Sequence, residues 1–393
     1  MSNSSAPTAE TVSIFGSTGS IGVQALEVIR SSESPLAVHA LSANSNLELL
    51  CAQIGEFKPR VVVVGSTEMA GAIRERFAGL ECRVGSEGLS QSAGEADVAL
   101  NAVVGFAGLS VTLGAVAAGR RLALANKESL VAGGAVVQAA LAKSGAEIVP
   151  VDSEHAAIHQ CLRSGSASEV ARLILTTSGG PFRSTSAEAL ASVSKADALR
   201  HPTWSMGPKI TVDSSTLMNK ALEIIEAVEL FSVRPDQVEV VVHPESVVHS
   251  MVGFVDGSLI AQLSEPDMRL PIAYALGYPA RLAPAYGAID FSRSFELRFE
   301  PPRRDVFRGL DFAYRALEIG NGAPAWLNAV NEVAVTNFLD DRINWCDIYP
   351  VIESSLELFV PVELNSAQDV VALDQMARLR CWEVIEKKFA SPR

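Results

Sequence analysis

Short apolar runs alternate with longer amphipathic segments along the first 150 residues of the chain. The apolar runs are typical of strands and lie at Val12–Phe15, Val38–Leu41, Val61–Val64, Val98–Asn101, Leu122–Ala125 and Ile148–Val151. Between them, segments such as Gln24–Arg30 and Leu47–Ile54 carry apolar residues at helical spacing. This alternation predicts an α/β fold in which helices cover both faces of a parallel sheet.

The pattern changes after residue 150. Strand-like runs follow at Leu173–Thr177, Ile210–Val212, Val238–Val242, Val247–Phe254 and Leu259–Leu263, and no long helix separates the last three. This closeness predicts a second sheet that is mixed or partly antiparallel. Beyond Glu300–Arg304 the chain reads as helices at Phe312–Ile319, Ala325–Asp340, Val351–Leu358 and Asp369–Lys388. We therefore expect three domains, over residues 1–150, 151–290 and 291–393.

Composition excludes several classes of partner. The chain has 32 basic and 45 acidic residues, a net charge of −13. With no basic cluster, binding to nucleic acid or to an anionic membrane is not expected. No apolar run reaches the roughly 18 residues that span a bilayer. The N-terminus lacks the features of a signal peptide and the five cysteines form no framework, so we expect a reducing cytoplasm.

A glycine-rich turn follows the first predicted strand, in Gly16-Ser17-Thr18-Gly19-Ser20-Ile21-Gly22. Glycine permits a tight turn and lets backbone amides approach a pyrophosphate at the start of the next helix. In this context the spacing indicates a Rossmann-like, dinucleotide-binding sheet, and an ordinary turn is the alternative. After the second strand, Asn44-Ser45-Asn46 offers no acidic residue to a ribose hydroxyl. That absence favours NADP(H) over NAD(H), although no cationic residue stands there either.

Two carboxylates follow the sixth predicted strand, in Asp152-Ser153-Glu154-His155. If the chain is still extended there, Asp152 and Glu154 point to one side and could chelate Mg²⁺ or Mn²⁺. They could instead cap a helix that begins at His155. His155 and His159 lie four residues apart, but the HExxH pattern of a zinc site is absent, which favours a histidine pair without metal.

Two segments of the middle region read as loops. Ser178-Gly179-Gly180 follows an apolar run and could form a nest of backbone amides for an anion, or simply a turn. The loop at about residues 199–208 contains two prolines and a glycine, yet it carries Trp204 and Met206. Large apolar side chains on a loop either pack into a core or close over a ligand, and we favour a lid.

Asp213-Ser214-Ser215-Thr216 is typical of a helix cap, so a helix is predicted to follow it. One apolar stripe of that helix consists of Leu217, Ala221, Ile224, Ile225, Val228 and Phe231. Asn219, Lys220 and Glu223 lie off the stripe at spacings of three and four, so they can converge. They could form a solvated face, or bind an anion while Glu223 supplies a third carboxylate to a metal.

Taken together, these segments resemble the 1-deoxy-D-xylulose 5-phosphate reductoisomerase family over nearly the whole chain. The resembling motifs are Gly16–Gly22 (GSTGSIG), Ala125–Glu128 (ANKE), Asp152–His155 (DSEH), Ser178–Arg183 (SGGPFR), His201–Gly207 (HPTWSMG), Asp213–Glu223 (DSSTLMNKALE), His243–His249 (HPESVVH) and Asn331–Val335 (NEVAV). Their order and separation are more specific than any one of them. The resemblance implies a Rossmann-like N-terminal domain, a central α/β catalytic domain with a mixed sheet, and a C-terminal α-helical domain, paired as a homodimer.

The resemblance also implies the site residues. The NADPH positions are Thr18, Gly19, Ser20, Ile21, Asn44, Ser45, Asn46, Asn126, Glu128 and Gly207. The ligands of Mg²⁺ or Mn²⁺ are Asp152, Glu154 and Glu223. The substrate positions are Lys127, Ser153, Glu154, Ser178, His201, Trp204, Met206, Ser214, Asn219, Lys220 and Glu223. Within that set, the residues implied to bind the substrate phosphate are Ser178, Ser214, Asn219 and Lys220. The catalytic residues are Lys127, Asp152, Glu154, His201 and Glu223.

The implied activity belongs to the non-mevalonate route to isoprenoid precursors. A divalent cation assists rearrangement of 1-deoxy-D-xylulose 5-phosphate to an aldehyde, which NADPH reduces to 2-C-methyl-D-erythritol 4-phosphate. The chain departs from the family at one place, because many members carry glycine and then lysine or arginine where this chain has Asn44-Ser45. The sequence therefore does not by itself predict a strict preference for NADPH over NADH.

Two other functions compete with this interpretation. An NADP-dependent semialdehyde dehydrogenase would need an activated cysteine, and Cys161 is the only cysteine near the expected site. However, the surrounding residues 156–162 read as helix and form no strand-to-helix elbow. A nucleotide-sensing protein would bind NADPH without metal-dependent turnover, and it would not need three carboxylates beside an anion pocket.

Overall fold

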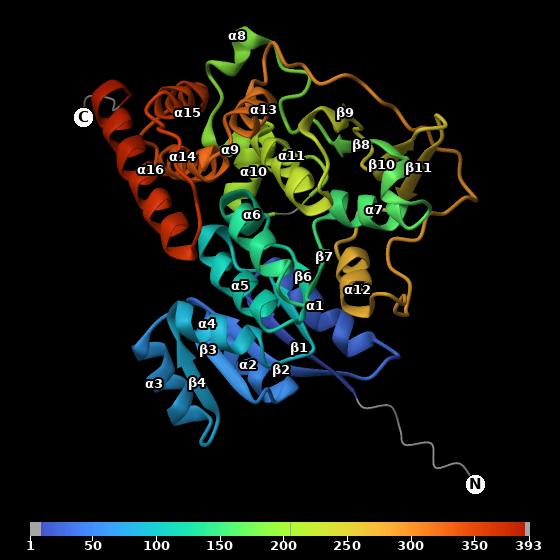
Figure 1. Cartoon of the computed structure of the whole chain (residues 1–393), viewed down its shortest axis with the longest axis vertical. Helices are drawn as coiled ribbons and strands as arrows, with labels where there is room; N and C mark the ends of the chain where they lie inside the picture. Colours follow the sequence, from blue (N-terminus) through green and yellow to red (C-terminus); the bar gives the residue numbers. More distant parts are fainter. Residues whose placement is uncertain (1–8, 205, 390–393) are drawn as a thin grey trace. The chain divides into compact units, whose positions relative to one another are not determined.

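The computed structural model describes residues 9–204 and 206–389, which fall into two units (Figure 1). Unit 1 holds the described residues of Met1–Asn126 together with Val137–Ala156 and Asp267–Ala288. Unit 2 holds the described residues of Lys127–Val136, Ala157–Pro266 and Ile289–Arg393. Each unit contains its own sheet. The expected division into three domains stays a prediction.

The sheet of unit 1 is entirely parallel among the described residues, as predicted. Its order is β4-β3-β2-β1-β5-β6-β7, and its strands are β1 (Glu10–Phe15), β2 (Leu36–Ala43), β3 (Val61–Val64), β4 (Glu81–Val84), β5 (Val98–Asn101), β6 (Arg121–Leu124) and β7 (Glu147–Pro150). The direction in which strands are added reverses between β1 and β5. Ligands of open α/β sheets bind at the carboxyl ends of the strands beside such a reversal.

Helices alternate with these strands, which explains the apolar character of the sheet. They are α1 (Ser20–Ser31), α2 (Leu47–Phe57), α3 (Thr67–Arg76), α4 (Gly85–Ala93) and α5 (Leu109–Ala117). All four residues of β3 are buried, because a parallel sheet with both faces covered needs a continuous apolar run. Two further helices, α6 (Glu128–Leu141) and α7 (Ser153–Leu162), each begin in one unit and end in the other.

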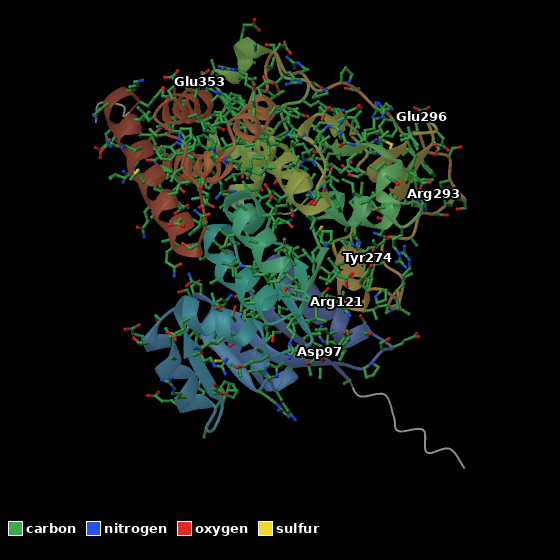
Figure 2. The ribbon with its side chains drawn as sticks, viewed as in Figure 1. Asp97, Arg121, Tyr274, Arg293, Glu296 and Glu353 are labelled. Atoms are coloured by element: carbon green, nitrogen blue, oxygen red, sulfur yellow. The ribbon has the colours of Figure 1, made fainter. Side chains whose placement is uncertain are left out.

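One helix of unit 1 comes from much later in the chain. Helix α12 (Arg269–Gly277) buries Ile272, Ala273 and Tyr274 in the same apolar core as the strands of the parallel sheet. Figure 2 labels Tyr274 of this helix and Arg121 of β6. The guanidinium of Arg121 donates a hydrogen bond of 3.0 Å to the carbonyl of Leu276. The parallel sheet therefore depends on a segment that no local pattern in the first 150 residues reveals.

Unit 2 contains the mixed sheet that the spacing of strands predicted. Its order is β11-β10-β8-β9, with strands β8 (Val170–Thr177), β9 (Val238–Val242), β10 (Val248–Phe254) and β11 (Leu259–Leu263). Strands β8 and β9 are parallel, whereas β10 pairs antiparallel with both β8 and β11. Strand β11 ends the order on one side and is thus an edge strand.

Besides α14 (Ala323–Leu339), whose residues are buried on nearly every side, unit 2 contains several further helices. They are α8 (Ala187–Leu190), α9 (Lys195–Ala198), α10 (Pro208–Ser215), α11 (Met218–Phe231), α13 (Gly309–Ile319), α15 (Ile348–Leu356) and α16 (Ala367–Lys388). Helix α14 contacts α13, α15 and α16, which appear with it in orange and red in Figure 1. Across the described residues, no helix has the length and apolar character needed to cross a bilayer.

Two local predictions were wrong, and one strand was missed. Ile210–Val212 is helical rather than extended, because Pro208 at the first turn of α10 starts a helix there. Asp213–Ser215 lie inside α10 and do not cap the next helix, and the residue before α11 is Leu217, in a left-handed conformation with φ of 54°. Of the predicted cap, only the Thr216 hydroxyl accepts a hydrogen bond from the start of α11, from the amide of Met218 over 3.3 Å. Strand β4 was missed because its four residues, ECRV, are half polar.

Candidate active site

The glycine-rich turn of unit 1 leaves the start of α1 open. Gly19 stands immediately before α1, and no side chain caps the first amides of that helix. Gly16 has φ of 83°, and a Cβ on Gly22 would lie 2.3 Å from the carbonyl oxygen of Gly16. Only glycine fits at these two positions, so the turn can pass close to a bound group. Thr18, Ser20 and Ile21 complete the part of the turn predicted to bind a pyrophosphate, and Ser20 is exposed.

Buried hydrogen bonds hold this turn against the neighbouring strand and helix. The amide of Ser17 donates to the carbonyl of Ser42 over 2.8 Å, and its hydroxyl donates to Gln53 over 2.7 Å. Gln53 in turn donates to the carbonyl of Ser17. The second residue of the motif therefore has a structural role, while the exposed tip at Gly19 stays accessible.

The other predicted cofactor residues of unit 1 lie at loops after parallel strands. Asn44, Ser45 and Asn46 follow β2 and are exposed, and the Asn46 side chain accepts from the amide of Leu49 to cap α2. Asn126 follows β6 and is buried. Its amide group donates over 2.8 Å to the carbonyls of Val103 and Gly105, in the loop after β5. Asn126 thus shapes the loop at the reversal of strand order.

The two carboxylates after β7 stand at the beginning of a helix. Asp152 directly precedes α7, and Glu154 lies in the first turn, so the chain is not extended there as assumed. Asp152 contacts Nδ1 of the buried His155 at 3.3 Å, and the Ser153 hydroxyl donates to Glu154. His155 is therefore buried and hydrogen-bonded. Oxygen donors at a strand's carboxyl end are suited to a hard divalent cation.

In unit 2, a buried cluster brings together four of the predicted residues. Lys127, which directly precedes α6, places Nζ 3.0 Å from Oδ1 of Asn219 and 3.1 Å from Oε1 of Glu223. Asn219 also donates to Glu223, and so does Lys220. Lys220 is 2% exposed and Glu223 is fully buried, so a solvated face is excluded for this pair. Two ammonium groups and one amide therefore converge on one carboxylate.

A second group of predicted residues meets at the loop after β8. The Ser178 hydroxyl lies 3.1 Å from Nε2 of His201, and Nδ1 of His201 accepts from the amides of Thr203 and Trp204. In neutral His201 the proton is therefore on Nε2, directed at Ser178. Gly180 has φ of 71°, and a Cβ there would lie 2.5 Å from the carbonyl of Ser214. The loop thus packs closely on the end of α10.

The expected lid is a loop between α9 and α10. The ring of Trp204 lies 6.4 Å from that of His249 on β10, tilted by 50°. Met206 is half-buried and Gly207 directly precedes α10. Ser205 of the HPTWSMG motif lies outside the described residues. Closure of this loop over a ligand stays a prediction.

One ion-pair network was missed at the sequence level. Lys209 on α10 lies 3.2 Å from Oε1 of Glu128 and 2.9 Å from Oδ2 of Asp213. Asp213 also accepts a hydrogen bond of 3.0 Å from Asn331 on α14. The i, i+4 spacing of Lys209 and Asp213 was a visible signal. Their contacts with Glu128 and Asn331 join residues 81 and 118 positions apart, which a local pattern does not reveal.

Cys161 has none of the features of a catalytic thiol. It is buried in α7, and burial raises the pKa of its thiol to about 11, although a backbone hydrogen bond at Gln262 opposes this. A nucleophilic cysteine needs a lowered pKa. The structure therefore argues against a dehydrogenase that forms a thioester at Cys161.

Comparison with known proteins identifies the family. Three family models match the chain: "1-deoxy-D-xylulose 5-phosphate reductoisomerase" over residues 12–134, the C-terminal domain model of that enzyme over residues 148–231, and the "DXP reductoisomerase C-terminal domain" over residues 263–380. The reductoisomerase of Protochlamydia amoebophila is 44% identical over 93% of this chain and 96% of its own. That of Heliobacterium modesticaldum is 49% identical over 88% of this chain and 90% of its own.

Solved structures agree with the sequence comparison. The reductoisomerase of Zymomonas mobilis in complex with NADPH has a TM-score of 0.90 and 38% identity, covering 97% of this chain and all of its own. A reductoisomerase in complex with NADPH, fosmidomycin and magnesium has a TM-score of 0.89 and 37% identity, covering 96% of this chain and 98% of its own. The chain belongs to the 1-deoxy-D-xylulose 5-phosphate reductoisomerase family.

Proposed function

We propose that this chain converts 1-deoxy-D-xylulose 5-phosphate to 2-C-methyl-D-erythritol 4-phosphate, with NADPH and a divalent cation, through the residues described above. The observation that carries the residue assignment is the cluster of Lys127, Asn219, Lys220 and Glu223 in unit 2. In this cluster, cationic hydrogen-bond donors that could bind a phosphosugar lie beside a carboxylate that could bind a metal ion. Such a combination exceeds what a nucleotide-sensing protein needs.

The glycine turn of unit 1 fits a dinucleotide. The first amides of α1 have no side-chain cap, and Gly16 and Gly22 leave no room for a side chain at the turn. A pyrophosphate there would accept hydrogen bonds from the backbone at Thr18–Ile21 and gain from the positive end of the helix dipole. Asn44, Ser45 and Asn46 would meet the adenosine phosphate with neutral donors only. We assign Asn126, Glu128 and Gly207 to the same cofactor.

The proposed metal ligands are Asp152, Glu154 and Glu223. All three are carboxylates and none is a soft ligand, which suits Mg²⁺ or Mn²⁺. This ligand set follows from the family motifs and from the chemistry of the donors. When bound, the cation supplies Lewis-acid catalysis and NADPH supplies a hydride.

The residues of unit 2 would then hold the substrate. Ser178, Ser214, Asn219 and Lys220 provide hydroxyl, amide and ammonium donors to the phosphate. Lys127 and His201, together with Ser153, are assigned to the sugar hydroxyls. Neutral His201 presents Nε2–H on the side of Ser178, so it would act as a hydrogen-bond donor. Trp204 and Met206 would exclude water by closing over the substrate.

We further propose that two copies pair through β11. Leu259, Ile260 and Leu263 on this edge strand are 49%, 37% and 38% exposed. An exposed apolar edge strand is a template for pairing with a second chain, and a two-fold axis would make the contact self-complementary.

All five cysteines lie within the described residues as free thiols, which supports a reducing cytoplasm.

The test is oxidation of NADPH, followed by absorbance, with 1-deoxy-D-xylulose 5-phosphate and Mg²⁺ or Mn²⁺. We expect oxidation that stops with EDTA and yields the branched methylerythritol phosphate, identified by NMR. A folded protein that binds NADPH but oxidises none in the presence of substrate and metal would contradict the proposed substrate. Oxidation that continues in EDTA would contradict the role of the carboxylates as metal ligands.

A further inference from the structure

Lys209 occupies an unusual position between two carboxylates. Its side chain is 19% exposed, whereas those of Glu128 and Asp213 are 8% and 1% exposed. Nζ lies 3.2 Å from Glu128 and 2.9 Å from Asp213, so one ammonium group bridges the start of α6 and the body of α10. A buried carboxylate without a partner is costly, so this cation stabilises both.

Asp213, one end of this ion pair, is also hydrogen-bonded to a C-terminal helix. The fully buried Asn331 of α14 donates to the second oxygen of Asp213 over 3.0 Å. Asp213 is therefore held by a cation on one side and an amide on the other. Because α14 packs against α13, α15 and α16, it gives the bridge a rigid support.

Both ends of this ion pair lie close in sequence to proposed cofactor residues. Gly207 directly precedes α10 and ends the loop after α9, and Lys209 follows it by two residues. Glu128 opens α6 immediately after Lys127, whose ammonium reaches Glu223. The two proposed NADPH contacts of unit 2, Gly207 and Glu128, thus stand on separate elements that this ion pair connects.

Charge on Lys209 is secure at neutral pH. Burial lowers the pKa of a lysine, but here it is outweighed by Asp213, Glu128 and Glu332, and the pKa lies above its ordinary value. An ammonium group that does not release its proton is unsuited to acid–base catalysis near neutrality. We therefore explain the ammonium group of Lys209 by its position, since it connects Glu128 to Asp213.

We propose that Lys209 is a positioning residue for NADPH, because it ties Gly207 at the start of α10 to Glu128 at the start of α6. This inference rests on the proposed function, in which Gly207 and Glu128 contact the cofactor. Without Lys209, Glu128 and Asp213 would be two neighbouring carboxylates with no cation between them. Glu128 would then lose its connection to α10, and the cofactor would meet a site with altered geometry and charge.

The test compares K209M, which keeps the length and removes the charge, with K209R, which keeps the charge. The dissociation constant of NADPH, measured by fluorescence titration without substrate, should rise roughly tenfold in K209M, a factor that corresponds to about 1.4 kcal/mol. KM for NADPH should rise with it, while kcat at saturating NADPH should change less. K209R should restore most of the affinity. Unchanged NADPH affinity in K209M, even with a lower melting temperature, would overturn the proposal.

The matched control is K195M. Lys195 also joins two elements, since it reaches the carbonyl of Leu339 and lies 3.3 Å from Asp341, but it contacts none of the proposed site residues. K195M should lower stability without changing the affinity for NADPH. Should K209M fail to fold, D213N replaces it, because it removes the charge that anchors Lys209. A folded D213N with wild-type affinity would overturn the proposal.

Failure of this inference differs from failure of the proposed function. Wild-type protein that binds no NADPH would overturn both at once. Wild-type protein that binds and oxidises NADPH, beside a K209M variant with the same affinity, would overturn the positioning role alone.

Discussion

The ammonium nitrogen of Lys127 lies 3.1 Å from a carboxylate oxygen of Glu223, although the two residues are 96 positions apart. Lys127 is fixed by its place at the start of α6, where its carbonyl accepts from the amides of Leu130 and Val131. Glu223 is fixed by α11. The pair therefore joins the ANKE motif to the MNKALE motif, and it explains why both belong to one site.

Replacement of Glu223 by glutamine should abolish most turnover and leave NADPH binding intact. The amide keeps the size of the side chain but cannot serve as an anionic metal ligand, so we expect kcat to fall about 100-fold or more. NADPH affinity and circular dichroism should stay as in the wild type. E229Q is the control on the same helix. Glu229 is not among the proposed site residues, and burial raises the pKa of its carboxyl group. Equal turnover in E223Q and E229Q would remove Glu223 from the metal site.

Replacement of Cys161 by alanine should leave the rate of NADPH oxidation nearly unchanged. The thiol is buried and its pKa is raised to about 11, so it supplies no nucleophile near neutrality. Loss of the sulfur from a packed position should reduce the free energy of unfolding by about 1 kcal/mol. The check is a steady-state assay beside a urea titration. Complete inactivation of a folded C161A variant would favour a thiol-dependent mechanism.

Acid should destabilise the fold through His159. Burial, reinforced by Arg163, lowers the pKa of His159 from 6.5 to about 4. Between these two pH values the unfolded chain binds a proton that the folded chain does not, so stability falls as pH falls, by at most about 1.4 kcal/mol per pH unit. Above pH 6.5 this contribution is fully present.

The H159Q variant tests this assignment, because glutamine has no proton to gain. Urea titrations at about pH 7.5 and about pH 5 should show a smaller loss of stability for H159Q than for the wild type. Parallel losses in both proteins would assign the acid sensitivity to other groups.

Cofactor preference should respond to a cation at Ser45. The wild-type loop offers only Asn44, Ser45 and Asn46 to the 2′-phosphate that distinguishes NADPH from NADH. In S45K we expect the ratio of kcat/KM for NADPH to that for NADH to rise roughly tenfold, as one new ion pair with phosphate would give. S34K, at another exposed serine of unit 1, should leave the ratio unchanged. An unchanged ratio in S45K would place the phosphate elsewhere.

Pairing through β11 should be sensitive to charge. Ile260 is 37% exposed on that edge strand, and lysine there would place repelling charges across a two-fold contact. We expect I260K to elute as a monomer in size-exclusion chromatography with light scattering, while the wild type elutes as a dimer. V371K, at a similarly exposed position on α16, should remain dimeric. A dimeric I260K would place the interface on another surface.

Short apolar runs were sufficient to locate several strands. Val61–Val64 and Leu259–Leu263 were predicted with the bounds of β3 and β11, because each run stands out from its polar surroundings. Ile210–Val212 failed because three residues of high strand propensity lie within a helix begun by Pro208 and supported by the Lys209–Asp213 pair. The strand propensity of three residues is weak, and these helix-stabilising interactions override it.

The site was only partly accessible to sequence reasoning. Spacing suggested that Asn219, Lys220 and Glu223 converge, and the structure confirms this. Spacing did not show that Lys127 joins them, because that contact depends on how α6 and α11 pack. The family resemblance implied that Lys127 is a site residue, but it did not explain why Lys127 lies beside Glu223. The contact between Lys209 and Glu128 was missed for the same physical reason.

Helix α12 has a consequence for the order in which the chain is made. Tyr274 and its neighbours complete the core of unit 1, yet they follow the whole mixed sheet in the sequence. At about 5–20 residues per second, on the order of ten seconds pass between synthesis of β7 and synthesis of α12. During that time the nascent parallel sheet exposes the apolar surface that α12 later covers. A fragment that stops at Pro150 would keep that surface exposed permanently, so the nucleotide-binding half should be insoluble when expressed alone.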